Sequence, residues 1–256
     1  MNRNLKMNLP KNRWSRWWMV VSYAIAMAWV ESAVVFYLRY MMDRIEPHQA
    51  DPFPIIGGFG WVELIREFST MVMLFTVGLL AGRTWRARIG YSVVAFGIWD
   101  IFYYVFLKLM CGWPHSLLDW DILFLLPLPW WGPVLTPVMI SLLMIFWGTL
   151  TTQFERSATP ALSNRRGWVL NLAGVVLALY VFMADTIAVA PRGLEAVCNV
   201  VPEKFDWTLF WIAWALMAAP AIQTGRRFLT RQRSMPQLSG TTQDLDATTA
   251  LTRDSL

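Results

Sequence analysis

The sequence has few charged residues and hardly any cysteine or histidine. Charged residues make up 15% of its 256 residues, whereas soluble domains contain about 25%. The two cysteines and two histidines form no CxxC pair and no metal-ligand spacing. A nucleophile elbow, a phosphate loop, a dinucleotide fingerprint and a zinc-protease helix are also missing. These absences argue against an ordinary soluble domain and against the enzyme classes recognised by such motifs, and the sequence names no cofactor.

Long hydrophobic runs, by contrast, are abundant. Hydrophobic residues make up 56% of the chain, and its mean hydropathy is +0.42. A helix needs about 20 residues to cross the bilayer core. Six runs reach that length, at residues 17–39, 61–82, 89–110, 132–153, 168–190 and 207–224. Tryptophans stand at several run edges, as in the aromatic belts of membrane proteins. The sequence therefore predicts an all-α, six-span transmembrane helical bundle surrounded by a lipid bilayer.

Basic residues follow alternate runs. Sixteen of the 22 Lys and Arg residues fall on one side if the chain crosses six times, which places both termini in the cytoplasm by the positive-inside rule. We expect a basic arm at 1–16, a membrane domain at 17–225 and a basic, then disordered, tail at 226–256. The first run is too long for a cleaved signal peptide, so it is expected to be a retained span. The net charge of +5 is spread around the spans, which argues against a nucleic-acid partner.

A short apolar segment separates the third and fourth runs. Residues 122–131 contain Pro127 and Pro129 and are too few to cross a bilayer. We expect a re-entrant or interfacial element packed against protein, because lipid cannot satisfy its free backbone groups.

Several ionisable residues lie inside the predicted spans. Glu63, Arg66, Glu67 and Thr70 share one face of the second run, at positions i, i+3, i+4 and i+7. An ionised group in the bilayer costs at least about 2.5–3.5 kcal/mol unless it is paired or faces a cavity. These side chains are therefore expected to converge on one outward-facing acidic pocket. The candidates from the three spans are Glu31, Arg39, Glu63, Arg66, Glu67, Asp100, Tyr104 and Lys108.

The loop after the third run adds polar candidates to the mouth of this pocket. It contains Trp113, His115, Asp119 and Asp121. The imidazole and the two carboxylates are weak candidates for a metal site, but Ser116 or Asp119 fits better as the N-cap of a short interfacial helix. Cys111 and Cys198 both fall on the predicted outer side, where either a disulfide or two separate thiols is compatible with the sequence.

One stretch carries a family resemblance. The segments ESAVVFYLR, ELIRE, WDIFYYVFLK and GWPHSLLDWDILFLLPLPWWGPV, within residues 17–137, resemble a group of uncharacterised bacterial polytopic inner-membrane proteins. The resemblance implies a bacterial inner-membrane location and carries over no activity.

Three functions are compatible with these observations. The first is binding or processing of a lipid or lipid-linked anionic substrate at the outer leaflet, with a membrane-protein partner as a further possibility. Its acid–base and orienting candidates are Asp100, Glu31, Glu67 and Tyr104. Its substrate-binding candidates are Arg39, Arg66, Lys108, Glu63, Asp119, Asp121 and Trp113. The second function is an accessory or assembly subunit whose ion pairs only fix the helix register. The third is a small transporter or a proton or cation pathway.

Overall fold

Six long helices make up most of the part of the chain that the structure describes. The computed structural model describes residues 12–43, 45–48, 58–153 and 165–234. The long helices are α1 (Arg13–Met41), α2 (Gly58–Ala81), α3 (Trp85–Cys111), α4 (Leu135–Gln153), α5 (Arg165–Val189) and α7 (Trp207–Ser234). All six are long and apolar enough to cross a membrane. The six-span helical bundle predicted from the sequence is therefore confirmed.

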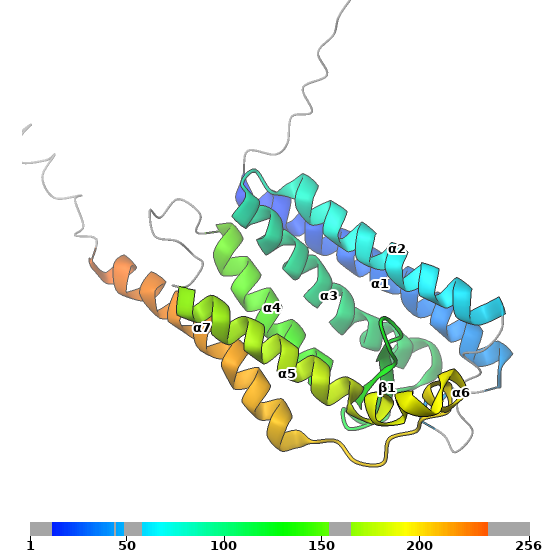
Figure 1. Ribbon diagram of the computed structural model, residues 1–256. Helices are drawn as coiled ribbons and strands as arrows, with labels where there is room; N and C mark the ends of the chain where they lie inside the picture. Colours follow the sequence, from blue (N-terminus) through cyan, green and yellow to red (C-terminus); the bar gives the residue numbers. More distant parts are fainter. Residues whose placement is uncertain (1–11, 44, 49–57, 154–164, 235–256) are drawn as a thin grey trace, which may run out of the picture.

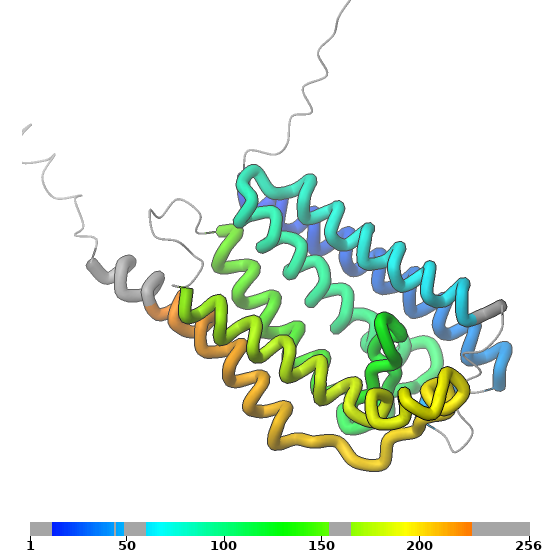
Figure 2. Tube along the Cα trace, in the orientation of Figure 1, coloured from blue at the N-terminus to red at the C-terminus, as the bar shows by residue number. Residues whose placement is uncertain are grey.

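The long helices are arranged around the third and fourth spans. α3 packs against α1, α2 and α4, while α5 packs mainly against α7 (Figure 1). The tube in Figure 2 shows the same order, with α1 and α2 at one side of the bundle and α5 and α7 at the other. Two short helices, η1 (Ala190–Arg192) and α6 (Leu194–Cys198), lead from α5 towards α7. α3 therefore lies at the centre of the part of the bundle formed with α1, α2 and α4.

A small β-hairpin follows α3. Strand β1 (Trp120–Phe124) pairs antiparallel with β2 (Trp130–Pro133), and the ladder is irregular between Ile122 and Phe124. The hairpin is the non-spanning element expected between the third and fourth spans. The predicted start of the fourth span at residue 132 was wrong, because that residue pairs within β2 and α4 begins only at Leu135.

Glycines allow the central helices to approach closely. A Cβ added to Gly148 would lie 2.6 Å from the carbonyl oxygen of Gly90, and one added to Gly97 would lie 2.7 Å from that of Ser141. Between α2 and α3, a Cβ on Gly78 would lie 2.4 Å from the backbone nitrogen of Ser92. The backbones of these helices are thus in near contact, which is the packing that small residues permit in membranes.

Arginines at one end of the bundle donate to the C-terminal carbonyls of neighbouring helices. Arg13 donates to the Gln153 carbonyl at 2.9 Å, and Arg16 donates to the Ala81 carbonyl at 2.9 Å. Both acceptors lie at helix C-termini, where cations also interact well with the helix dipole. The helix bounds also differ from the predicted domain bounds. α1 begins at Arg13, within the predicted 1–16 arm, and α7 continues to Ser234, past the predicted start of the tail at residue 226. Most of the predicted arm (1–11) and of the predicted tail (235–256) lies outside the described residues.

Candidate functional site

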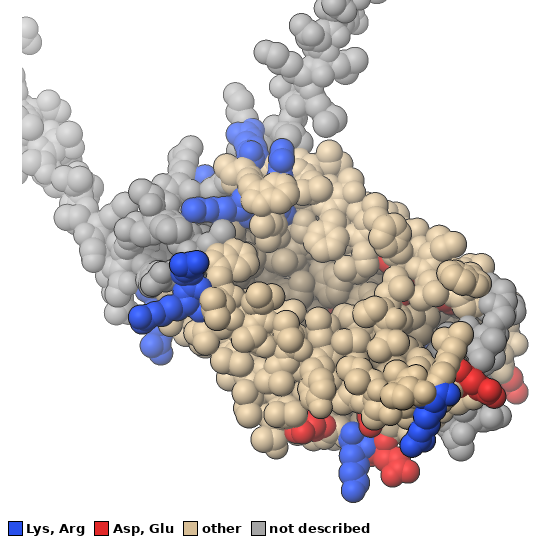
Figure 3. Space-filling view, in the orientation of Figure 1, with Lys and Arg blue, Asp and Glu red and all other residues tan. Residues whose placement is uncertain are grey.

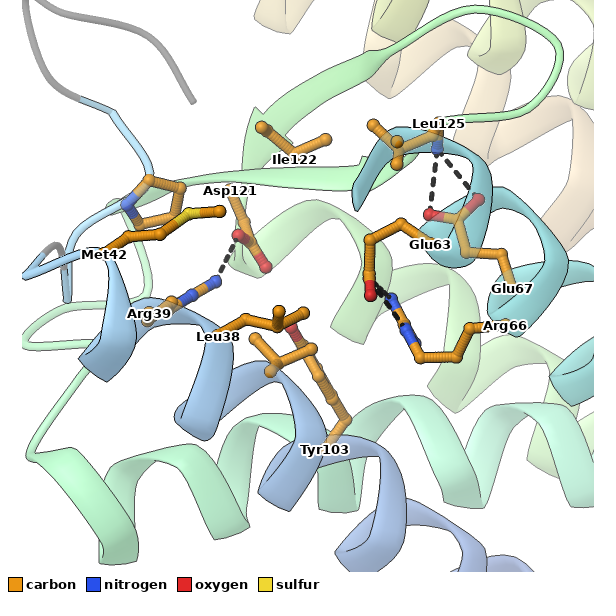
Figure 4. Close-up of a pocket in the computed structure, with 13 residues that line it drawn as sticks. Leu38, Arg39, Met42, Glu63, Arg66, Glu67, Tyr103, Asp121, Ile122 and Leu125 are labelled. Carbon is orange, nitrogen blue, oxygen red and sulfur yellow. Dashed lines mark hydrogen bonds and ion pairs between the residues drawn. The ribbon is translucent and has the colours of Figure 1, made fainter. Parts of the chain in front are cut away.

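A polar cavity lies between α1, α2, α3 and the hairpin. Its volume is about 120 Å³, enough for several water molecules. Figure 4 shows charged side chains from three of these elements pointing into it, Arg39 from α1, Glu63, Arg66 and Glu67 from α2, and Asp121 from β1. The structure therefore brings these five residues together around one cavity.

Arg39 and Asp121 form a buried ion pair at one wall of the cavity. Arg39 Nη2 lies 2.9 Å from Asp121 Oδ1, and the two side chains are only 6% and 1% exposed. The Arg39 guanidinium also lies 4.2 Å from the ring centroid of Trp113 and donates to the Ile45 carbonyl. Among the described residues, Asp121 Oδ2 has no hydrogen-bond partner. This pair links the end of α1 to the hairpin.

Arg66 joins α2 to α1 at the opposite wall. Its guanidinium forms ion pairs with Glu31 and with Glu63, the latter at 2.6 Å. Thr70, one helical turn further along α2, donates to Glu31 Oε2 at 2.9 Å. Glu31 is thus held by two side chains of the face that the spacing of α2 predicted.

Glu67 ties α2 to the hairpin in a different way. Both of its carboxylate oxygens lie 3.0 Å from the backbone nitrogen of Leu125, which donates to them. Among the described residues Glu67 has no ion pair within 4 Å. The described part of the cluster therefore contains four carboxylates, from Glu31, Glu63, Glu67 and Asp121, and two guanidiniums, both already engaged with carboxylates.

Asp100 and Tyr104 lie behind the cavity wall. Asp100 is 7% exposed and accepts a hydrogen bond of 2.8 Å from Ser141 on α4. Tyr104 is 6% exposed, packs with Trp113 and Val134, and lies beside Asp121. Neither residue lines the cavity, so direct contact of Asp100 with a ligand in the cavity, as the sequence analysis expected, has no support in the structure.

Lys108 points away from the site, which corrects its predicted place in the pocket. Its side chain is exposed and donates to the Gly112 carbonyl at 2.8 Å. Gly112, with a φ of 78°, ends α3 in the left-handed region, so Lys108 satisfies a free carbonyl at a helix C-terminus. Because Lys108 follows Tyr104 by four residues, it lies on the same face of α3 as Tyr104. It is, however, one helical turn further along the helix, beyond the cavity.

The loop residues form turns and do not assemble a metal site. The backbone of His115 donates to Asp119 at 2.7 Å, and that of Leu118 donates to Ser116 at 3.1 Å. The segment is a turn and not the capped helix that was expected. The His115 ring lies 3.4 Å from Glu46, whereas Asp121 faces Arg39 inside the protein. Within the described ranges no three His, Cys, Asp or Glu residues are grouped to hold a metal ion.

The two cysteines are free thiols. Cys111 donates to the Leu107 carbonyl within α3, and Cys198 is buried at the end of α6. Burial raises the pKa of the Cys198 thiol above its usual value. Of the two alternatives left open by the sequence, the structure has separate thiols.

Two contributors to the site were missed by the sequence analysis. Tyr103 lines the cavity, although Tyr104 was selected as the candidate. Ser141 supplies the hydrogen bond to Asp100 from a span that contains no charged residue. The position of Tyr103 beside Asp100 on the sequence was an available signal for the first residue, whereas a serine in an apolar helix gave none.

The protonation of Asp121 is expected to alter stability between pH 4 and 6. Burial raises the pKa of the Asp121 carboxyl to about 6, and Arg39 partly opposes the shift. Between the ordinary pKa of about 4 and this value the folded state holds a proton that the unfolded state has lost, so stability falls as pH rises. Relative to Asp121→Asn, the wild type should lose about 3 kcal/mol of unfolding free energy across this interval.

Unfolding of both proteins in detergent at pH 4 to 8 measures this difference. The other charged or titratable groups near Asp121 are Arg39, Tyr104, Tyr103 and Asp100, and their own titration is present in both proteins. If the difference in unfolding free energy between the wild type and Asp121→Asn stays constant with pH, Asp121 does not titrate in this interval.

Comparison of the chain with protein-family models, with curated proteins and with solved structures gives no match. The resemblance described for residues 17–137 stays a prediction.

Proposed function

We propose that this integral membrane protein binds the polar head group of a lipid or lipid-linked molecule in the cavity between α1, α2, α3 and the hairpin. The observation that carries the proposal is the convergence of charged side chains from α1, α2 and β1 on one cavity of about 120 Å³. Ionisable residues inside membrane proteins generally mark functional sites, because their burial is expensive. Apolar walls from Val35, Leu38 and Ile122 complete a site of mixed polarity that suits an amphiphile.

The charges favour an amine-bearing head group over the anionic one expected from the sequence. Arg39 is engaged with Asp121, and Arg66 with Glu31 and Glu63. An anion would have to displace one of these carboxylates from its guanidinium. An ammonium group would instead form the ion pair that Glu67 lacks among the described residues, where Glu67 accepts from the Leu125 backbone N–H and interacts with Arg66 only at longer range.

The interior of the bundle supports binding rather than passage across the membrane. Beyond the polar cluster, α1, α2 and α3 meet in an apolar core that includes Val20, Ala24, Leu74 and Val94, each at most 1% exposed. A transport route would need polar groups along this path. The alternative of a structural cluster is supported by one observation, the complete pairing of both arginines.

We further infer that the end of the bundle that carries the hairpin faces outward. The excess of Lys and Arg at the opposite end supports this orientation under the positive-inside rule. A bacterial inner membrane is the location implied by the family resemblance.

Binding of short-chain phosphatidylethanolamine to purified protein in detergent tests the proposal. Glu67→Gln should weaken this binding by about 10-fold or more, because a hydrogen bond to a charged group contributes about 1.5–3 kcal/mol. Glu195→Gln is the matched control, since Glu195 is an exposed carboxylate on α6, outside the cavity.

The comparison lipid is short-chain phosphatidylglycerol, which lacks the amine. Binding of phosphatidylglycerol as tight as that of phosphatidylethanolamine, with Glu67→Gln affecting neither, would overturn the proposed selectivity. Absence of binding by both lipids would leave the cluster with a structural role and overturn the proposed function.

A further inference from the structure

A second cavity lies at the other end of the bundle, between the α3–α4 pair and the α5–α7 pair. Its volume is about 320 Å³, within the usual range of about 300–1,000 Å³ for ligand sites. We call it the basic-end groove. Its lining comes from α3, α4, α5 and α7 and includes Ile89, Ile140, Trp147, Gly167, Asn171 and Val175.

The walls of the groove are apolar and elongated along the helices. Its α5 wall extends from Gly167 to Val175 and its α4 wall from Ile140 to Trp147, lengths of about 10–12 Å at the helical rise. Asn171 is the one amide side chain among these lining residues. The groove exists because α5 packs mainly against α7, which leaves α4 and α5 apart in this half of the bundle.

Arginines are close in sequence to lining residues of the groove on two different helices. Arg165 and Arg166 immediately precede the lining residue Gly167 on α5, and both are exposed. On α3, Arg88 immediately precedes the lining residue Ile89, and Arg86 lies three residues before it. Arg86 is exposed, and Arg88 donates weakly to the Gly82 carbonyl at 3.4 Å. Figure 3 shows basic side chains gathered at this end, beside a hollow in the apolar surface.

We propose that the basic-end groove holds an anionic phospholipid of the adjacent leaflet, with one acyl chain in the groove and its phosphate near Arg165, Arg166 and Arg86. The apolar walls match the chain, and the charge at the mouth is complementary to the head group. Basic pockets between transmembrane helices are a known mode of lipid recognition, and each Lys or Arg near the surface contributes to it. This site is separate from the hairpin-end cavity and takes a head group of opposite charge.

The location makes a lipid the fitting occupant. In this half of the bundle the groove lies within the candidate spans, so its surroundings are acyl chains rather than water. Trp147 and Trp168 line it near the basic end, where amphipathic rings favour the head-group level of a membrane. An occupant with an apolar tail and an anionic end satisfies both parts of the site at once.

Quantification of lipids that stay bound to the full chain tests the proposal. The protein is purified from mixed phosphatidylglycerol and phosphatidylcholine, and native mass spectrometry measures both. The wild type should retain phosphatidylglycerol preferentially. Arg165→Gln combined with Arg166→Gln should lower that preference by about fivefold for each arginine. Arg192→Gln, at an exposed arginine in η1 beyond the opposite end of α5, is the charge control.

A second pair of variants separates the groove from general surface attraction. Val175→Trp fills the groove and should abolish preferential retention, whereas Leu172→Trp, at a residue that is 64% exposed on the same helix and does not line the groove, should leave it unchanged. Equal retention in the two tryptophan variants would overturn the proposal. The proposal would also be overturned if the wild type formed a dimer that Val175→Trp dissociates and Leu172→Trp does not. A second copy of the chain would then occupy the groove.

Discussion

Replacing Arg39 with methionine is expected to lower the free energy of unfolding by about 3–5 kcal/mol, because removal of one partner leaves a buried charge uncompensated. The Asp121 side chain is 1% exposed, and Arg39 is its ion-pair partner at 2.9 Å. Methionine keeps much of the apolar length of the side chain but removes the guanidinium and its stacking on Trp113. Chemical unfolding in detergent micelles measures the loss.

The pH dependence and a double variant identify the cause of this loss. Arg39 lowers the pKa of the Asp121 carboxyl, so without it that pKa rises further above 6. The destabilisation should therefore be largest above pH 6 and shrink as Asp121 takes up a proton at lower pH. Adding Asp121→Leu to Arg39→Met should recover most of the stability, since a buried pair replaced by apolar residues is often neutral. A double variant as unstable as Arg39→Met would show that the charge is not responsible.

Replacing Gly148 with alanine is expected to destabilise the protein by about 2–3 kcal/mol, at the upper part of the range for overpacking. The added Cβ would lie 2.6 Å from the Gly90 carbonyl oxygen and 2.7 Å from a methyl of Val94. A backbone oxygen in a helix cannot move aside by rotating a torsion, so α3 and α4 must separate. Separation of these helices would also stretch the hydrogen bond from Ser141 to Asp100.

Gly225→Ala is the matched control for this substitution. Its Cβ would lie 3.2 Å from the far end of the Phe146 ring, a side chain that can adjust. Because alanine favours a helix over glycine by up to about 1 kcal/mol, this variant should be neutral or slightly more stable. Thermal unfolding of both variants in the same detergent makes the comparison. Equal midpoints would contradict the close α3–α4 packing.

The ion pairs on α2 show how far local spacing predicts a site. Glu63, Arg66, Glu67 and Thr70 were assigned to one face from their separations alone, and each makes a contact to the cavity cluster in the folded chain. The same reasoning failed at Lys108. Spacing gives the direction of a side chain around a helix axis, but the position of the cavity along that axis depends on the neighbouring helices.

The hairpin shows a second limit. Asp119 and Asp121 were treated as equivalent loop carboxylates, yet Asp121 is buried against Arg39 and Asp119 accepts a hydrogen bond in an exposed turn. Two prolines and a short apolar run indicated that the segment does not span the membrane. They did not indicate which side chain would face the protein, because that depends on the register of the two strands and on their contact with α1.

Composition and the spacing of apolar and basic residues determined, by themselves, that the chain forms six membrane-length helices with a non-spanning segment after the third. Helix length and hydrophobicity are local properties, and they set the free energy of transfer to a bilayer without reference to any partner. Only the tertiary structure decided that Arg39 pairs with Asp121, that Glu67 binds the hairpin backbone and that Asp100 turns to Ser141. The two residues in each of these contacts are separated by 41 to 82 positions in the sequence. Only the packing of the helices brings them together.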